Sequence, residues 1–260
     1  MRPLCDGFIL GANLDFILRA LSYPRSVVSG VLFLSCTLVL SLVTVLGNMI
    51  FNNRAFDSAI ISFWGRLTCR LFGVKVVLHG LENLPTGGCI LAFNHTSFFD
   101  IFSMIGYIPD IRFGAKIELF RIPLFGWAMR RTGILPIPRQ NREEAYRVYE
   151  EAEARLRAGE KFALAPEGTR QQTQELGKFK AGPFIFAIRG GVPVVPVVIK
   201  NAAQVLPKGA WLPNFGVWSS ELHIHILPPV PSTGMHVEDR GLLQRQVHAE
   251  MAKILASPNL

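Results

Sequence analysis

The sequence has little charge and even less acid. Only 18% of its 260 residues are Asp, Glu, Lys or Arg, below the roughly one quarter usual for a soluble domain. Half of the residues are hydrophobic and the mean hydropathy is +0.31, so the apolar content exceeds what one globular core needs, and a membrane is the obvious sink. Lys and Arg outnumber Asp and Glu by 27 to 19, a net charge of +8. Such a balance favours anionic lipid headgroups, nucleic acid or an acidic carrier protein as partners.

Cysteines are also few, and they are scattered. None of the four lies close to another in the sequence, so neither a zinc site nor a disulfide framework is indicated, and a reducing compartment fits best. The sequence has no internal repeat and no low-complexity segment. The basic charge is spread out and no nucleic-acid-binding motif accompanies it, so nucleic acid is not expected as a partner.

One long run has no charge at all. Residues 26–51 read SVVSGVLFLSCTLVLSLVTVLGNMIF, which is longer than the roughly 20 residues of a spanning helix and longer than a signal-peptide core. The run predicts a membrane-embedded helix; the alternative is a buried core helix. Residues 55–72 have apolar side chains at helical spacing and could return along the membrane surface. Whether the segment spans the bilayer or enters one leaflet stays open.

The basic residues around this run indicate an orientation. Three arginines precede it and four basic residues follow it closely: Arg2, Arg19 and Arg25, then Arg54, Arg66, Arg70 and Lys75. The positive-inside rule favours a cytoplasmic side for the C-terminal part. The predicted location is therefore the cytoplasmic face of the inner (plasma) membrane.

From residue 74 onward, short β-branched runs alternate with helical patterns. The candidate strands are 74–80, 89–94, 110–116, 133–137, 161–166, 192–199 and 221–227, and the candidate helices are 141–158 and 237–256. This alternation predicts an α/β domain with a mixed, largely buried sheet flanked by helices. We therefore divide the chain into N-terminal membrane-anchoring helices, 1–73, and an α/β domain, 74–260.

The stretch FNHTSFFD, residues 93–100, places a histidine at the expected carboxyl end of a strand, where ligands of α/β sheets tend to bind. If His95 lies in the turn and Asp100 in the first turn of the next helix, the carboxylate can accept from one imidazole nitrogen and leave the other to take a proton. The alternative is structural, because Ser97 and Asp100 together resemble a capping box. Spacing alone leaves both readings open.

Three further stretches carry polar residues where strands are expected to end. In APEGTR, residues 165–170, a glycine permits close backbone approach and Thr169 and Arg170 suit a phosphate; a solvated loop is the alternative. GILPIPR ends at Arg139, and Lys116 begins an apolar segment, 115–133, that could face lipid, line an acyl chain or pack in a core. In VPVVPVVI, two prolines suit an edge or bulged strand.

The order of these motifs is more specific than any one of them. NHTSFFD, GILPIPR, APEGTR and VPVVPV, with AKIELFRIPLFGW between the first two, resemble the glycerolipid acyltransferase family. The resemblance is closest to bacterial 1-acylglycerol-3-phosphate acyltransferases and covers residues 74–199. The family pattern Asn-His-x-Ser-x-x-Asp is filled by Asn94, His95, Ser97 and Asp100.

The resemblance implies that His95 deprotonates the hydroxyl of a lysophospholipid, that Asp100 holds the imidazole, and that the oxygen attacks an acyl thioester without an acyl-enzyme. It implies a phosphate site among Lys116, Arg139 and Arg170, with Glu167, Gly168 and Thr169 at the glycerol end, and Asn94 and Ser97 near the substrate. Backbone amides at the helix start are expected to stabilise the oxyanion. Acyl-CoA or acidic acyl carrier protein would be the co-substrate, with no cofactor.

Two alternatives remain at this stage. The acceptor could be another lysolipid, such as a lyso-ornithine lipid, or the chain could be an inactive lipid-binding membrane protein. His223 and His225 share one face of a predicted strand and could bind a metal, but the sequence suggests no third ligand, so no metal is predicted.

Overall fold

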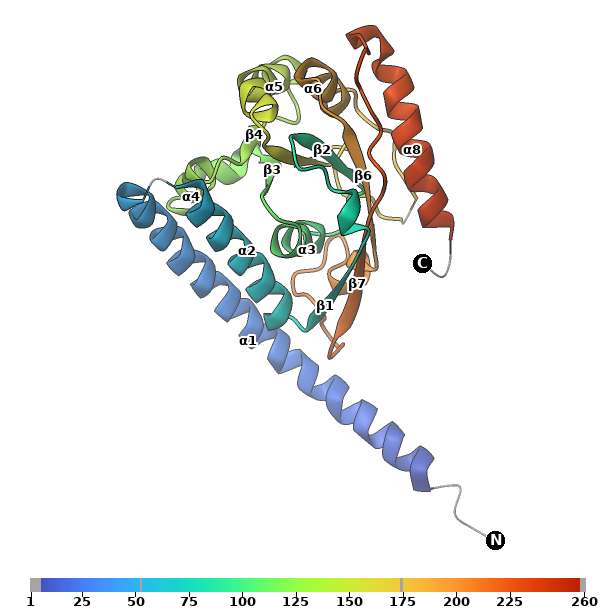
Figure 1. The fold of residues 1–260 in the computed structure, drawn as a ribbon. Coiled ribbons are helices and arrows are strands. Elements are labelled where there is room, and N and C mark those ends of the chain that lie inside the picture. Colours follow the sequence, from blue (N-terminus) through green and yellow to red (C-terminus); the bar gives the residue numbers. More distant parts are fainter. Residues whose placement is uncertain (1–5, 52, 174, 258–260) are drawn as a thin grey trace.

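The computed structural model describes residues 6–51, 53–173 and 175–257, and within the first helix it describes side chains from residue 16 onward. Cys5 and Arg2, used in the sequence arguments, lie outside the described residues. The first helix, α1 (Asp6–Ile50), starts twenty residues before the charge-free run. The second, α2 (Arg54–Leu71), lies alongside α1, and the side chain of Asn53 caps its start by accepting from the amide of Ala55. Figure 1 shows the two helices as a hairpin on one side of the molecule.

Seven strands form one mixed sheet in the order β1-β7-β6-β2-β5-β3-β4. Their bounds are β1 Val74–His79, β2 Cys89–Phe93, β3 Ile111–Lys116, β4 Leu135–Ile137, β5 Lys161–Leu164, β6 Val194–Lys200 and β7 Ser220–Ile226. Strand β1 is parallel to β7, and β7 is antiparallel to β6, so these two strands run opposite to the other five. The predicted α/β fold with a mixed sheet is confirmed.

Helices cover both faces of the sheet (Figure 1). Helix α2 and α3 (Phe99–Tyr107) pack on one face; α5 (Arg142–Arg157), α6 (Gly182–Gly190) and α8 (Arg240–Ala256) pack on the other. Because side chains alternate along a strand, Leu91 and Phe93 of β2 enter the first core and Ile90 and Ala92 enter the second. The shorter helices are η1 (Leu81–Asn83), η2 (Ile117–Arg121), α4 (Phe125–Arg131), α7 (Ala202–Val205) and η3 (Val237–Asp239).

The expectation that β6 is an edge strand is wrong. Strand β6 lies between β2 and β7 in the middle of the sheet. The carbonyl of Pro196 accepts from the amide of Leu227. The N–H and C=O of a strand residue point to the same side, so the N–H that proline lacks would also face Leu227. Leu227 lies just past Ile226, the last residue of β7. Proline is tolerated there because it costs one bond at the end of a ladder, not one in its middle.

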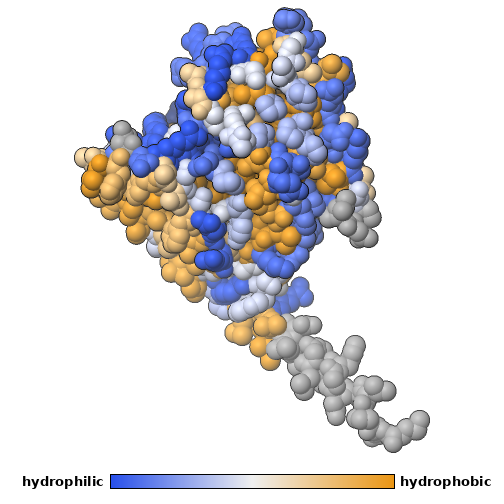
Figure 2. Space-filling model, viewed as in Figure 1, coloured by the Kyte–Doolittle hydropathy of each residue, from blue (hydrophilic) through white to orange (hydrophobic). Residues whose placement is uncertain are grey.

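The long helix α1 has two different sides. Its polar side chains bond to the rest of the protein: Ser26 Oγ to Asn214 O, Ser29 Oγ to Leu71 O, Thr37 Oγ1 with Trp64 Nε1, and Asn48 Nδ2 with Asp57 Oδ1. The opposite side exposes large apolar residues, and Figure 2 shows the apolar surface along this flank of the molecule. Within the described residues, Phe16–Ile50 is the one helical stretch long and apolar enough to cross a membrane.

Helix α2 belongs to the core of the α/β part as well as to the hairpin, because Ile61 and Cys69 pack under the sheet with α3. The division of the chain after residue 73 stays a prediction. The apolar segment 115–133 combines two of the expected roles: Phe120 and Met129 are buried in a small core, whereas Trp127 is 61% exposed.

Candidate active site

The candidate site begins where β2 ends. The chain leaves the buried strand at Phe93, turns through residues 94–98 and enters α3 at Phe99. In this turn His95 Nδ1 lies 2.8 Å from Asp100 Oδ2. Both side chains are almost entirely buried, with 4% of the histidine and none of the aspartate exposed. The predicted pair is therefore formed, and Nε2 is the ring nitrogen left to handle a proton.

Asp100 also organises the turn itself. The same oxygen, Oδ2, accepts from the backbone amides of Thr96 and Ser97, each at 2.8 Å. The capping and catalytic readings of Asp100 are thus compatible, because one oxygen serves the helix start and the imidazole together. These two amides are committed to the carboxylate, and the amide of Phe99 donates to Ser97 Oγ. None of the three is therefore available as an oxyanion donor in this geometry.

A second loop holds the backbone of His95 from both sides. After β5, Glu167 Oε2 accepts from the His95 amide at 3.2 Å, and the Gln171 amide donates to the His95 carbonyl at 2.8 Å. The other Glu167 oxygen accepts from the amide of Gly177 at 3.1 Å. Burial raises the pKa of Glu167, and the bonds from Gly177 and His95 offset part of that rise. Glu167 therefore positions the histidine in this structure; the predicted contact with glycerol stays a prediction.

Two residues predicted to lie near the substrate are used inside the protein. Asn94 bridges β2 to β6 with both amide atoms, donating to Ile199 O at 2.9 Å and accepting from Ile199 N at 2.7 Å. Ser97 is fully buried and its hydroxyl donates to Leu206 O at 3.0 Å. Both side chains fix the turn that carries His95, and the Ser97 hydroxyl is turned away from any role as a nucleophile.

The three predicted phosphate ligands lie at the exits of neighbouring strands. Lys116 ends β3 and its ammonium lies 3.5 Å from Glu118 Oε1. Arg139 follows β4, and its pKa is lowered chiefly by burial and further by the charge of Arg170, while Tyr149 and Glu118 oppose the shift. The charges of Arg139 and Arg170 therefore interact, which agrees with their positions after β4 and β5, the two strands beside β3.

Arg170 and the glycine of the same loop are held by specific contacts. The Arg170 guanidinium stacks over the Phe98 ring, 4.1 Å from its centroid, which places it beside the turn that carries the histidine. Gly168 has φ +73°, a left-handed conformation that favours glycine at this turn. Thr169 is exposed next to it, which agrees with a position open to a ligand.

Together these contacts define the class of site. A histidine whose Nδ1 is held by a buried carboxylate has the arrangement that a general base requires. The cationic groups nearby suit a phosphate. The fold is that of an α/β protein with a buried histidine–aspartate pair at the carboxyl end of β2, one of its central parallel strands.

Comparison with known proteins gives the family. The model of the family described as Acyltransferase matches residues 75–200. Those residues run from the second residue of β1 to the last residue of β6 and contain every predicted site residue. Residues 75–200 of this chain therefore match an acyltransferase domain.

Named relatives agree with this assignment. The chain is 29% identical over 193 residues to the 1-acyl-sn-glycerol-3-phosphate acyltransferase of Pseudomonas aeruginosa, covering 72% of this chain and 71% of that protein. It is 33% identical to the chloroplastic enzyme BAT2 of Brassica napus, covering 60% of this chain but 46% of that protein, so it spans about half the length of this plant relative.

A solved structure resembles the whole fold. The crystal structure of the 1-acyl-sn-glycerophosphate acyltransferase PlsC from Thermotoga maritima has a TM-score of 0.67 and 25% identity. The match covers 89% of this chain and all of that one. It therefore extends well beyond residues 75–200.

Sequence reasoning missed two features. The first is the clamp on the His95 backbone, which is formed by Glu167 and the Gln171 amide, with the Gly177 amide bound to Glu167. It depends on backbone amides, for which a single sequence carries no signal. The second feature is His79, the last residue of β1, which lies beside His223 and His225. His79 is the third nitrogen ligand that the sequence did not indicate beside His223 and His225.

Proposed function

We propose that this chain is a 1-acylglycerol-3-phosphate O-acyltransferase. It transfers an acyl chain from an acyl thioester, acyl-CoA or acyl carrier protein, to the free hydroxyl of 1-acyl-sn-glycerol-3-phosphate and gives phosphatidic acid. The observation that carries the proposal is the 2.8 Å contact between His95 Nδ1 and Asp100 Oδ2 inside a domain of this family. The names of the relatives support the choice of acceptor.

In the proposed reaction, His95 Nε2 takes the proton from the acceptor hydroxyl as its oxygen attacks the thioester carbonyl. The C–O bond forms, the tetrahedral intermediate collapses, and the C–S bond breaks. The imidazolium then returns its proton to the leaving thiolate, so the products are the new ester and a free thiol. Asp100 stabilises the transient imidazolium. A thioester is already activated, so the reaction requires no metal or other cofactor.

The cationic residues give the proposed acceptor its orientation. Lys116, Arg139 and Arg170 would bind the phosphate, because charge-assisted hydrogen bonds from guanidinium groups suit phosphate oxygens. The acyl chain of the acceptor would remain in lipid, next to the apolar flank of α1 seen in Figure 2. The basic residues that follow α1 favour a site on the cytoplasmic face of the inner membrane.

The direct test is turnover by purified full-length protein in detergent or vesicles, with a panel of lysolipid acceptors and both thioester donors. We expect 1-acylglycerol-3-phosphate to be the preferred acceptor and His95→Ala to abolish thiol release. Unchanged turnover in His95→Ala would eliminate the mechanism. A higher rate with a phosphate-free lysolipid would instead reassign the acceptor.

The phosphate site has its own test. We expect Arg170→Ala to raise the KM for the phosphate-bearing acceptor more than it lowers kcat. Arg245→Ala, which removes an exposed arginine on α8, is the matched control and should leave both constants unchanged. An equal loss with a phosphate-free acceptor would show that Arg170 does not bind phosphate.

A further inference from the structure

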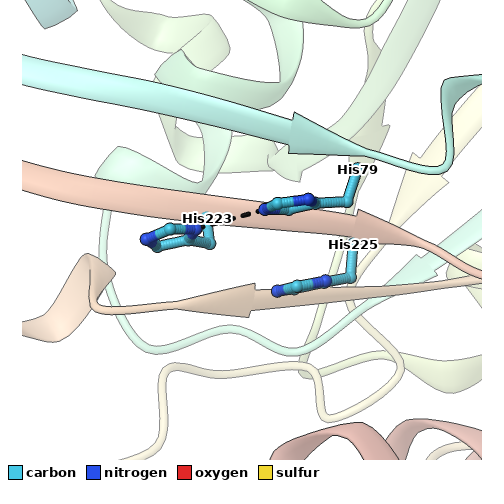
Figure 3. A group of neighbouring side chains, drawn as sticks. All are labelled: His79, His223 and His225. Atoms are coloured by element: carbon cyan, nitrogen blue, oxygen red, sulfur yellow. Dashed lines mark hydrogen bonds between the residues drawn. The ribbon is translucent and has the colours of Figure 1, made fainter. Parts of the chain in front are cut away.

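Three histidines from two strands lie together on the outer part of the sheet. In the parallel pairing of β1 with β7, His79 lies opposite His225, and His223 is two residues earlier on the same face. Figure 3 shows the three rings side by side. Their planes are within 15° of parallel, and the His79 centroid is 4.5 Å from His225 and 5.5 Å from His223.

The ring nitrogens are close to metal-ligand spacing. His79 Nε2 is 3.2 Å from His223 Nδ1, and one nitrogen from each of the three rings lies within 4.8 Å of the others. Nitrogens bound tetrahedrally to Zn²⁺ at about 2.0–2.1 Å are about 3.3 Å apart. The nitrogens of His79 and His223 already have about that separation. Rotation of the exposed His79 side chain and the half-buried His223 side chain can bring their nitrogens closer to His225.

A carboxylate supports the cluster from outside. Glu221 Oε1 lies 3.1 Å from His223 Nε2, the nitrogen opposite the one that faces His79. Glu221 Oε2 is in turn 2.7 Å from Lys75 Nζ. An ionised carboxylate that accepts from Nε2–H leaves the lone pair on Nδ1 pointing into the cluster, the usual arrangement around a metal-bound histidine.

The cluster is separate from the acyltransferase site. Leu222 and Ile224 alternate with the two β7 histidines and point into the core beneath α3, where Phe93 also packs against His95. His223 and His225 therefore face the opposite side of the sheet, the side that carries α8. None of the three is needed by the proposed acyl transfer.

We propose that His79, His223 and His225 bind one late first-row divalent metal ion, with Zn²⁺ the expected occupant and a remaining position open to water. Neutral imidazoles are preferred ligands for such metals. The ion would join β1 to β7 across 144 residues of sequence and hold the edge strand of the sheet in place, so its effect would be on the stability of the fold.

The test uses full-length protein without a histidine tag, in detergent, after removal of metals with a chelator. Zn²⁺ is titrated in competition with a chromogenic indicator, Co²⁺ is followed by its visible d–d bands, and thermal unfolding is recorded with and without Zn²⁺. We expect one ion per chain, tetrahedral Co²⁺ bands and a raised Tm. No binding in competition with the indicator would overturn the proposal.

Variants locate the ion. His79 is exposed, so His79→Ala should fold, and we expect it to weaken Zn²⁺ binding at least about tenfold and remove the Tm shift; His223→Gln should do the same from the other strand. Glu221→Gln should weaken binding about 10- to 100-fold. His248→Ala, a histidine on α8 outside the cluster, is the control. Unchanged binding in His79→Ala and His223→Gln would refute the site, and unchanged binding in Glu221→Gln would refute the role of the carboxylate.

Discussion

Replacing Asp100 with asparagine would separate the charge of this residue from its hydrogen bonds. Asp100 Oδ2 accepts from three donors, the amides of Thr96 and Ser97 and the His95 ring. In Asp100→Asn, the two backbone N–H groups require the amide oxygen, not its nitrogen, at the position of Oδ2. The Nδ1–H of His95 therefore keeps its acceptor and the imidazole keeps its tautomer, while the negative charge beside the ring is lost.

The size of the effect follows from that single loss. A hydrogen bond to a charged group contributes about 1.5–3 kcal/mol. If this contribution is needed only when the imidazolium forms, removing it lowers kcat about 10- to 150-fold, because each 1.36 kcal/mol is about a factor of ten in rate. Asp100→Ala is a poorer test, because it leaves three buried donors without an acceptor, at a cost of about 1–3 kcal/mol each. The summed cost is comparable to the free energy of unfolding of a whole domain, about 5–15 kcal/mol.

The assay is initial-rate thiol release from acyl-CoA with saturating 1-acylglycerol-3-phosphate, and thermal unfolding of each variant checks folding. Asp110→Asn is the matched control: this aspartate is exposed and has φ 55°, a conformation that asparagine tolerates. We expect the control to keep the parental kcat. A well-folded Asp100→Asn enzyme with undiminished kcat would refute the reasoning, because the carboxylate charge would then play no part in proton transfer.

Four further predictions concern stability and reactivity. Glu167→Ala removes the acceptor of two backbone amides and should lower the free energy of unfolding by about 2–6 kcal/mol, measured by denaturation in detergent; an unchanged midpoint would contradict the clamp. Burial raises the pKa of Cys69 and Cys89 to about 12, so an alkylating reagent at pH 8 should modify them only after unfolding, as judged by peptide mass spectrometry, and rapid labelling of the native protein would be inconsistent with their burial. Because the unfolded thiols ionise near their ordinary pKa of 9.0, stability should fall as the pH rises from 9 towards 12. Asn48→Ala leaves the buried carboxylate of Asp57 without its 2.7 Å donor and should cost about 1–3 kcal/mol, seen as a lower Tm in micelles, whereas an equal Tm would mean that the pair contributes nothing.

Features set by neighbouring residues could be predicted from the sequence. Asn141 marks the start of α5 by accepting from the amides of Glu143 and Glu144, which is a local interaction. The contact of His95 with Asp100 spans five residues and depends only on a strand that ends and a helix that begins. The order of motifs along the chain supplied the rest of the assignment.

Features set by distant pairing could not be predicted from the sequence. The bonds of Asn94 to Ile199 could not be foreseen, because the two residues are 105 positions apart in the sequence. His79 was overlooked because only the register of β1 with β7 brings it to His225. The wrong expectation that β6, which contains Pro196, is an edge strand has the same origin. A proline is tolerated inside a sheet where the neighbouring strand ends, and the sequence does not show where that is.

The polar contacts of α1 have a practical consequence for protein production. The helix presents hydrocarbon on its outer flank, but Ser26 and Ser29 bind the loop before β7 and the end of α2. Deleting it to obtain a water-soluble fragment would remove these partners and uncover the apolar side of α2 and its neighbours. A truncated chain should therefore aggregate instead of dissolving, because the α/β part needs α1 to cover its apolar side.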